Sequence, residues 1–146
     1  MKIEDVCYMA GFMDGEGTIT ANYRESDRGF PSLHFRAIIF NTNLGVLEHL
    51  QNLWGGRLSL FQKSRSIKHK PIYNLYWGGK DCLPVLEAIL PYLVIKKRQA
   101  GIVLEMSKLT SHYEKGQQGR IVSPEVQKAR EGLVEEIKQL NHRGAL

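Results

Sequence analysis

The sequence is poor in cysteine and has no long apolar run. Cys7 and Cys82 are the only two cysteines among 146 residues, too few for a disulfide framework or a thiolate zinc site. No stretch approaches the roughly 18 consecutive apolar residues that a membrane-spanning helix needs. The first fifteen residues hold three acids against one lysine, which argues against a secretory signal or a transit peptide. We therefore expect a reduced, intracellular protein without a membrane partner.

Acidic residues are missing between Glu48 and Asp81. This stretch holds six basic residues, which are Arg57, Lys63, Arg65, Lys68, Lys70 and Lys80. Residues 57–98 carry a net charge of +7, from nine lysines and arginines against two acids, whereas the whole chain carries +5. A concentrated basic stretch is typical of a protein that binds a polyanion, most simply nucleic acid. A solvated protein surface is the alternative interpretation.

The pattern of apolar residues predicts one α+β domain over residues 1–146. Helical periodicity, strict alternation and turn residues give the following elements: a helix over 3–15, strands over 17–24 and 33–42, a helix over 44–54, strands over about 57–64 and 72–78, and helices over 82–90, about 95–109 and 124–141. The order α-ββ-α-ββ-α, followed by helices, predicts a four-stranded antiparallel sheet. Helices would cover one face of this sheet, and the other face would remain open and polar.

Capping residues mark two of the later helices. Asp81 is the expected N-cap of the helix over 82–90. Ser123, Pro124 and Glu125 form the cap, first-turn proline and first-turn acid of the last helix. A loop rich in glycine and glutamine is expected before that helix.

Small residues recur along the first helix. Cys7, Gly11 and Gly15 are spaced four apart, which places them on one face. Glycine inside a helix costs about 0.5–1 kcal/mol relative to alanine, so two glycines here need a reason. Close approach of a second helix, which gains dispersion contacts, is the simplest one.

Two acids, Asp14 and Glu16, stand at the end of the same helix, where the helix dipole disfavours negative charge. If the approaching helix belongs to a second copy of the chain, two Glu16 carboxylates meet near a two-fold axis. A hard cation such as Mg²⁺ would remove their repulsion. Metals held between carboxylates commonly hydrolyse phosphodiesters. The alternative is a frayed helix end with two solvated acids and a turn at residues 15–17.

The segment MAGFMDGEG (Met9–Gly17), with the strand-like GTITANYR following at once, resembles the LAGLIDADG signature of homing endonucleases position for position. The resemblance covers most of residues 3–109 and leaves 110–146 as a helical extension, either a cap or a source of phosphate contacts. One motif copy is present, as in the homodimeric branch of that family. The resemblance implies a dimer seam on the first helix and two open sheet faces forming a saddle over the DNA major groove. The implied seam residues are Cys7, Ala10, Gly11, Asp14 and Gly15.

The resemblance also implies catalytic residues. Glu16 lies where the family places its metal-binding acid, which is more often Asp, and the carbonyl oxygen of Gly15 would be a further ligand. Asp14 would support the helix end. Lys96, in VIKKRQA, resembles the lysine that organises water and charge around the scissile phosphate. Asn43, in FNTN, falls near a polar residue that positions the nucleophilic water. The implied cofactor is Mg²⁺, with Mn²⁺ or Ca²⁺ able to replace it in binding.

Polar side chains on the strands are candidates for reading bases, because a two-stranded ribbon fits the major groove. Basic loop residues are expected to contact phosphates and set the register. The strand candidates are Thr20, Asn22, Arg24, His34, Arg36, Arg57, Ser59, Lys63, Arg65, Asn74 and Tyr76, and the loop candidates are Arg28, Lys68 and Lys70.

The predicted function is a site-specific endonuclease that makes a staggered double-strand break in DNA at a long, near-palindromic target. It would act on the DNA of its host genome, in the mobility of an intron, intein or free-standing gene, and take no small-molecule substrate. The alternative is a binding module of the same fold, either an intron RNA maturase or a transcription factor without catalysis. Glu16 and Lys96 favour the enzyme, since a pure binder has no use for a carboxylate near phosphates. A third alternative, a protein that does not act on nucleic acids, would offer no reason for the basic hairpin other than chance.

Overall fold

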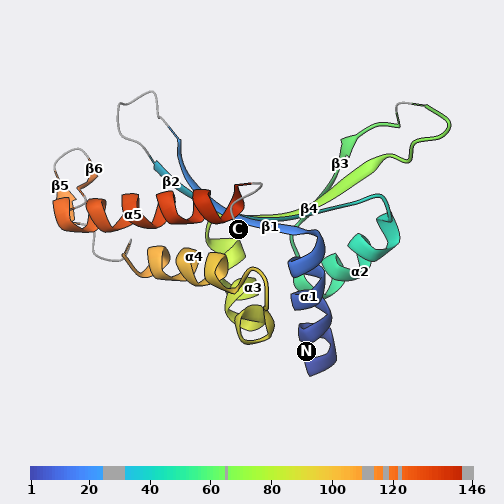
Figure 1. The fold of residues 1–146 in the computed structure, drawn as a ribbon, viewed down its shortest axis with the longest axis horizontal. Coiled ribbons are helices and arrows are strands. Elements are labelled where there is room, and N and C mark those ends of the chain that lie inside the picture. The colour runs from blue at the N-terminus through green and yellow to red at the C-terminus, as the bar shows by residue number, and fades with distance from the viewer. Residues whose placement is uncertain (25–31, 65, 110–113, 117–118, 122, 143–146) are drawn as a thin grey trace.

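The computed structural model describes residues 1–24, 32–64, 66–109, 114–116, 119–121 and 123–142. It is an α+β fold in which helices cover one face of a four-stranded antiparallel sheet, as the sequence predicted (Figure 1). The first half of the chain contains α1 (Ile3–Glu16), β1 (Gly17–Arg24), β2 (Ser32–Asn41), α2 (Leu44–Trp54), β3 (Arg57–Gln62) and β4 (Ile72–Gly78).

The second half of the chain is mainly helical. It contains η1 (Gly79–Asp81), α3 (Cys82–Ile89), η2 (Leu90–Tyr92), α4 (Lys97–Leu109), β5 (Glu114–Gly116), β6 (Gly119–Ile121) and α5 (Pro124–Asn141), where η marks a 3-10 helix. The small β5–β6 hairpin lies where the sequence predicted a loop. It was not predicted because three-residue strands are too short to show an alternating pattern. Among the described helices, none is long and apolar enough to cross a membrane.

The strands lie in the order β1-β2-β4-β3, so each hairpin contributes one central and one edge strand. The centre of the sheet is the row in which Gly17 pairs with Ile39, Ile39 with Leu75, and Leu75 with Leu58. Figure 1 shows the two hairpins diverging from this centre, both on the side away from the helices. The sheet therefore presents a broad surface that no helix of the described chain covers.

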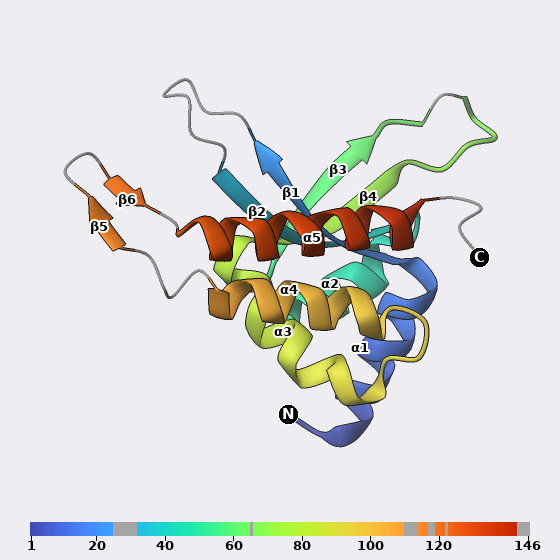
Figure 2. The same cartoon turned by 60° about the vertical axis from the view of Figure 1, so that its left-hand side comes forward.

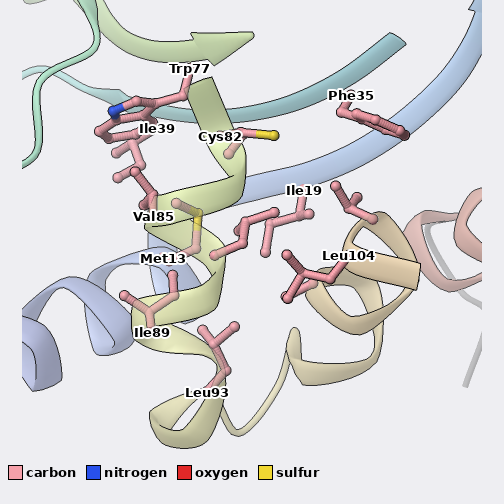
Figure 3. Close-up of a cluster of buried hydrophobic side chains, with 14 of the residues drawn as sticks. Met13, Ile19, Phe35, Ile39, Trp77, Cys82, Val85, Ile89, Leu93 and Leu104 are labelled. Carbon is pink, nitrogen blue, oxygen red and sulfur yellow. The ribbon is translucent and has the colours of Figure 1, made fainter. Parts of the chain in front are cut away.

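The core lies between the sheet and the helices. Alternate strand residues point toward the helices and are fully buried, among them Ile19, Ile39 and Leu75. Figure 3 shows Ile19, Ile39 and Trp77 from the strands beside Met13 and Ile89 from the helices. The other residues of the strands point to the open face, as the alternation predicted.

The C-terminal helix α5 packs on α4 and on the edge strand β1 (Figures 1 and 2). Arg98 of α4 holds it through two hydrogen bonds to the Glu136 carboxylate, at 2.7 and 2.9 Å, and also bonds to Glu105 at 2.9 Å. These bonds raise the pKa of Arg98 and lower the pKa of Glu136. At the far end of α5, the Asn141 amide donates to the carbonyl oxygen of Ile19 at 2.8 Å. The helix therefore covers one sheet edge and completes the core.

Other local predictions also differ from the structure. The Asp81 side chain makes no capping hydrogen bond, because η1 runs directly into α3 and Asp81 itself has helical dihedral angles. Strand β3 ends at Gln62 rather than at residue 64, because the register shifts after Leu60 and places Gln62 opposite Ile72. Helix α4 begins at Lys97 rather than at residue 95. The predicted Ser123 cap is confirmed, since its hydroxyl accepts the Val126 N–H at 3.3 Å.

Gly17 generates a prediction about stability. It follows α1 without a connecting residue, and a Cβ added there would lie 2.7 Å from the Met13 carbonyl oxygen, closer than real Cβ atoms approach. We expect Gly17→Ala to lower the free energy of unfolding by about 1–3 kcal/mol, measured by urea denaturation. The matched control is Gly101→Ala in α4, where the added Cβ meets open space. It should raise stability by up to about 1 kcal/mol, and similar effects from both variants would contradict the close contact.

Candidate functional site

Glu16 is the last residue of α1, and strand β1 begins at the next residue. Its side chain is exposed at the helix end, beside the exposed Gly15. The final carbonyl groups of a helix lack partners within the helix, so they are available to other groups. The junction of α1 and β1 thus places a carboxylate and backbone oxygens at the centre of the sheet.

Asp14 anchors a distant segment to this helix end. Its carboxylate accepts the backbone N–H groups of Val94 at 2.8 Å, Ile95 at 3.1 Å and Lys96 at 2.9 Å. The segment of residues 93–96 connects η2 to α4 and is called the strap below. Three hydrogen bonds to one charged acceptor fix the strap against α1 at a sequence separation of about 80 residues.

Lys96 reaches the same helix end with its side chain. Its ammonium group donates to the carbonyl oxygens of Met13, at 3.1 Å, and Asp14. Partial burial lowers the pKa of Lys96, while the nearby Asp14 and Glu16 carboxylates oppose that shift. The structure therefore brings together Glu16 and Lys96, the two residues for which the resemblance implied central catalytic roles.

The oxygen donors at this end suit a hard cation. Glu16 offers a carboxylate and Gly15 a backbone carbonyl, whereas the carbonyls of Met13 and Asp14 already accept from Lys96. In the part of the chain that the structure describes, no three His, Cys, Asp or Glu side chains form a metal-binding group. Mg²⁺ takes six oxygen ligands, so this donor set fits the ion but needs oxygens from outside the chain.

Asn43 has a structural role that the resemblance did not imply. Its side-chain oxygen accepts the Val46 N–H at 3.1 Å and caps α2, while its own N–H donates to Asn41 at 2.8 Å. The signal was present in the sequence, because asparagine directly before a helix is a preferred N-cap. The role of Asn43 in positioning water remains a prediction.

The face of α1 turned away from the core carries the small residues. Cys7, Gly11 and Gly15 are exposed, and a Cβ at either glycine would meet nothing within 4 Å. Ala10 was expected on this seam, but it is completely buried in the chain's own core. Each residue turns about 100° around a helix, which carries Ala10 away from the face of Gly11. Asp14 is partly buried and engaged with the strap.

The strap adds apolar surface that sequence reasoning missed. Val94 is 84% exposed and Ile95 is 70% exposed, although both are held beside α1 by Asp14. Ile3, at the other end of α1, is 53% exposed. The apolar run of residues 93–95 in a short connection between helices was the available signal.

The open face of the sheet gathers most of the predicted DNA contacts. Thr20 pairs with Arg36, Asn22 with His34, Ser59 with Asn74, and Arg57 with Tyr76, so all eight residues share this face. The Ser59 hydroxyl donates to the Asn74 side-chain oxygen at 2.8 Å. Strands β1 to β4 contain no acidic residue. The face is therefore polar and free of carboxylates on its strands.

The remaining DNA candidates have other positions or are not described. Lys63, predicted in a strand, follows the end of β3, and Lys68 and Lys70 are exposed in the connection to β4. Arg28 and Arg65 lie outside the described residues, and Arg24 belongs to β1 with a side chain that is not described. Sequence reasoning also missed Phe40 and Phe61 on the open face, because it considered polar residues only.

Asp14 generates the prediction for this site. Asp14→Ala removes an acceptor shared by three backbone N–H groups, so we expect the free energy of unfolding to fall by about 1–3 kcal/mol. Asp14→Asn keeps one oxygen acceptor, so its free energy of unfolding should lie between those of the wild-type and Asp14→Ala proteins. The control Glu87→Ala, at an exposed position of α3, should change stability by less than about 0.5 kcal/mol. Urea denaturation measures all three, and an Asp14→Ala protein as stable as wild type would contradict the anchoring role.

Comparison with known proteins places this geometry in a recognised fold. No family profile matches the sequence, and no curated protein does. The solved structure of the homing endonuclease I-CvuI with an I-CreI target superposes with a TM-score of 0.75 at 20% identity, over 98% of this chain and 88% of that one. The archaeal intron-encoded homing endonuclease I-Vdi141I, complexed with DNA, gives 0.73 at 19% identity, over 97% and 86%.

A third similar structure is the meganuclease I-SmaMI bound to DNA, with a TM-score of 0.71 at 16% identity. The superposition covers 99% of this chain but only 46% of I-SmaMI, so this chain spans about half the length of that protein. The agreement extends through α5, so it includes the extension beyond the core of residues 3–109. The chain therefore has the fold of the LAGLIDADG homing endonucleases, as the resemblance of its first helix implied.

Proposed function

We propose that the chain is a DNA endonuclease that acts as a homodimer and hydrolyses phosphodiester bonds at a specific site. The observation that carries this proposal is that the exposed Glu16 carboxylate and the Lys96 ammonium lie at the same end of α1, where β1 begins, close enough to influence each other electrostatically. A carboxylate repels phosphate, so a protein that only bound DNA would gain nothing from Glu16 at this position. An exposed acid beside a positioned cation suits phosphodiester hydrolysis.

The open face supports double-stranded DNA as the substrate. Its strands bear Arg36, Arg57 and His34 without one acidic residue, and both hairpins extend away from the helices (Figure 1). Strands of this kind can enter the major groove and donate to base edges, while lysines in the connections neutralise phosphates. The structurally similar I-CvuI and I-Vdi141I were both solved with DNA.

The exposed side of α1 supports the homodimer. Gly11 and Gly15 let a second α1 approach closely, and burial of Val94 and Ile95 would stabilise the association. A two-fold axis through this face would bring the Glu16 residues of both copies together. It would also relate the two open faces by the same symmetry, so the target would be near-palindromic and both strands would be cut. We further propose that the two cuts are staggered.

Divalent cations complete the proposed site. Glu16 and the Gly15 carbonyl would hold Mg²⁺, with remaining ligands from water, phosphate and the second chain. The bound ion would activate water and stabilise the leaving oxygen. I-CvuI was solved with DNA in the presence of 2 mM Mg in one case and 2 mM Ca in another. Lys96 donates two of its three N–H groups to carbonyls, so the third can donate to a phosphate oxygen or a water.

Glu16→Gln is the variant that tests catalysis. It keeps the shape of the side chain and removes its charge, so we expect cleavage to fall on the order of 100-fold or more while DNA binding persists. Cleavage is measured with Mg²⁺ on a target selected from a randomised duplex library, and binding is measured with Ca²⁺ by mobility shift. The control Glu125→Gln, exposed at the start of α5, should leave both unchanged. Wild-type cleavage by Glu16→Gln would refute the proposed role, and binding without cleavage by wild type would identify a DNA-binding module.

Gly11→Leu is the variant that tests the dimer. A leucine on the exposed face of α1 keeps two helices apart, so we expect a monomer in sedimentation velocity. The monomer should remain folded, because leucine is a better helix former than glycine and a Cβ at this exposed position meets nothing within 4 Å. Gly132→Leu, on the exposed side of α5, is the matched control and should remain dimeric. A dimeric Gly11→Leu protein would show that the subunits do not pair through this face.

A further inference from the structure

The open face of the sheet carries an apolar pair among its polar residues. The rings of Phe40 on β2 and Phe61 on β3 meet edge to face, with centroids 4.8 Å apart and planes at 69°. Phe61 is 59% exposed, so one side of the pair faces solvent. The helices lie behind the opposite face, and they cannot cover these rings.

The register explains why the two rings meet. Phe40 and Ser59 both pair with Asn74, one from each side of β4. The register then shifts between Leu60 and Gln62, which leaves Phe61 as the extra residue of a bulge. A bulge bends its strand and redirects the side chain. Phe61, two residues after Ser59, contacts Phe40, which lies in the same row as the hydrogen-bonded Ser59–Asn74 pair.

The surroundings of the pair indicate the chemistry of its ligand. The strands of this face bear arginine, histidine, amide and hydroxyl groups but no carboxylate, so the proposed partner is the major groove of DNA. Among the groups that bases display in that groove, the apolar one is the C5-methyl of thymine, and phenylalanine is a side chain that contacts it. Exposed rings placed among hydrogen-bonding groups match this mixed surface.

We propose that the Phe40–Phe61 pair reads the C5-methyl group of one thymine in each half-site of the target. The proposal rests on the proposed DNA-binding function and adds a specificity determinant of a different kind from the polar strand residues. Hydrogen-bonding side chains distinguish thymine from cytosine by its O4 acceptor. An apolar pair distinguishes thymine from uracil, because the methyl group is their only difference.

The test uses that difference. Wild-type protein first selects a preferred duplex from a randomised library in the presence of Ca²⁺. Each thymine of the selected duplex is then replaced by deoxyuridine, one symmetry-related pair at a time, and the Kd is measured. We expect one pair of positions at which uracil weakens wild-type binding by about fourfold per half-site, the effect of one buried methyl group. Phe61→Ala should bind the thymine and uracil duplexes equally.

Two variants keep the result interpretable. Phe61 is exposed, so Phe61→Ala should fold, and its thermal unfolding is measured alongside binding. Ile67→Ala, at an exposed apolar residue in the connection of the same hairpin, is the matched control and should keep the full uracil effect. Phe40→Leu, which retains an apolar side chain, should keep part of the weakening of binding that uracil causes in the wild-type protein.

Two outcomes would overturn the inference. Wild-type binding that is insensitive to uracil at every position is the first. The second is a Phe61→Ala protein with the same uracil effect as wild type. If that protein is also less thermally stable, the pair only stabilises the hairpin. Failure of the proposed function is distinguishable, because wild-type protein would then select no preferred duplex at all.

Discussion

The contact between the Asp14 carboxylate and the backbone of residues 94–96 determines the arrangement of the candidate site. Three N–H groups converge on one side chain, and their chain segment then presents Lys96 to the carbonyl end of α1. The same contact exposes Val94 and Ile95 beside the glycine face of that helix. One side-chain carboxylate therefore organises both the surface proposed for pairing and the ammonium proposed for catalysis.

Local patterns in the sequence were sufficient for most of the fold. Strict alternation gave β1 its bounds, the apolar stripe of residues 44–54 gave α2, and Ser123 with Pro124 marked the start of α5. The motif at Met9–Gly17 led to the correct fold even though identity to the similar structures is 20% or lower. These features depend on neighbouring residues, so they can be read without knowledge of the tertiary structure.

Long-range contacts could not be predicted from these local patterns. The bonds from Asp14 to residues about 80 positions away, and the Arg98 contact with Glu136 of α5, have no local signal. Ala10 was placed on the seam from its place in the motif, but the packing of α1 on the core decides which of its faces is exposed. Phe61 was passed over because only polar strand residues were considered, and its contact with Phe40 of another strand depends on how β2, β4 and β3 pair.

The direct passage from α1 into β1 has a geometric consequence. No residue separates Glu16 from Gly17, and Gly17 packs tightly against Met13, so little chain is available to vary the angle between the helix and the first strand. If two copies pair through α1, the crossing angle of the two helices fixes the distance between the two first strands. The packing of the two helices would then determine the number of base pairs between the two halves of a target. The strand residues would determine which bases are recognised within each half. Repacking the seam would alter target length without touching a single residue that reads sequence.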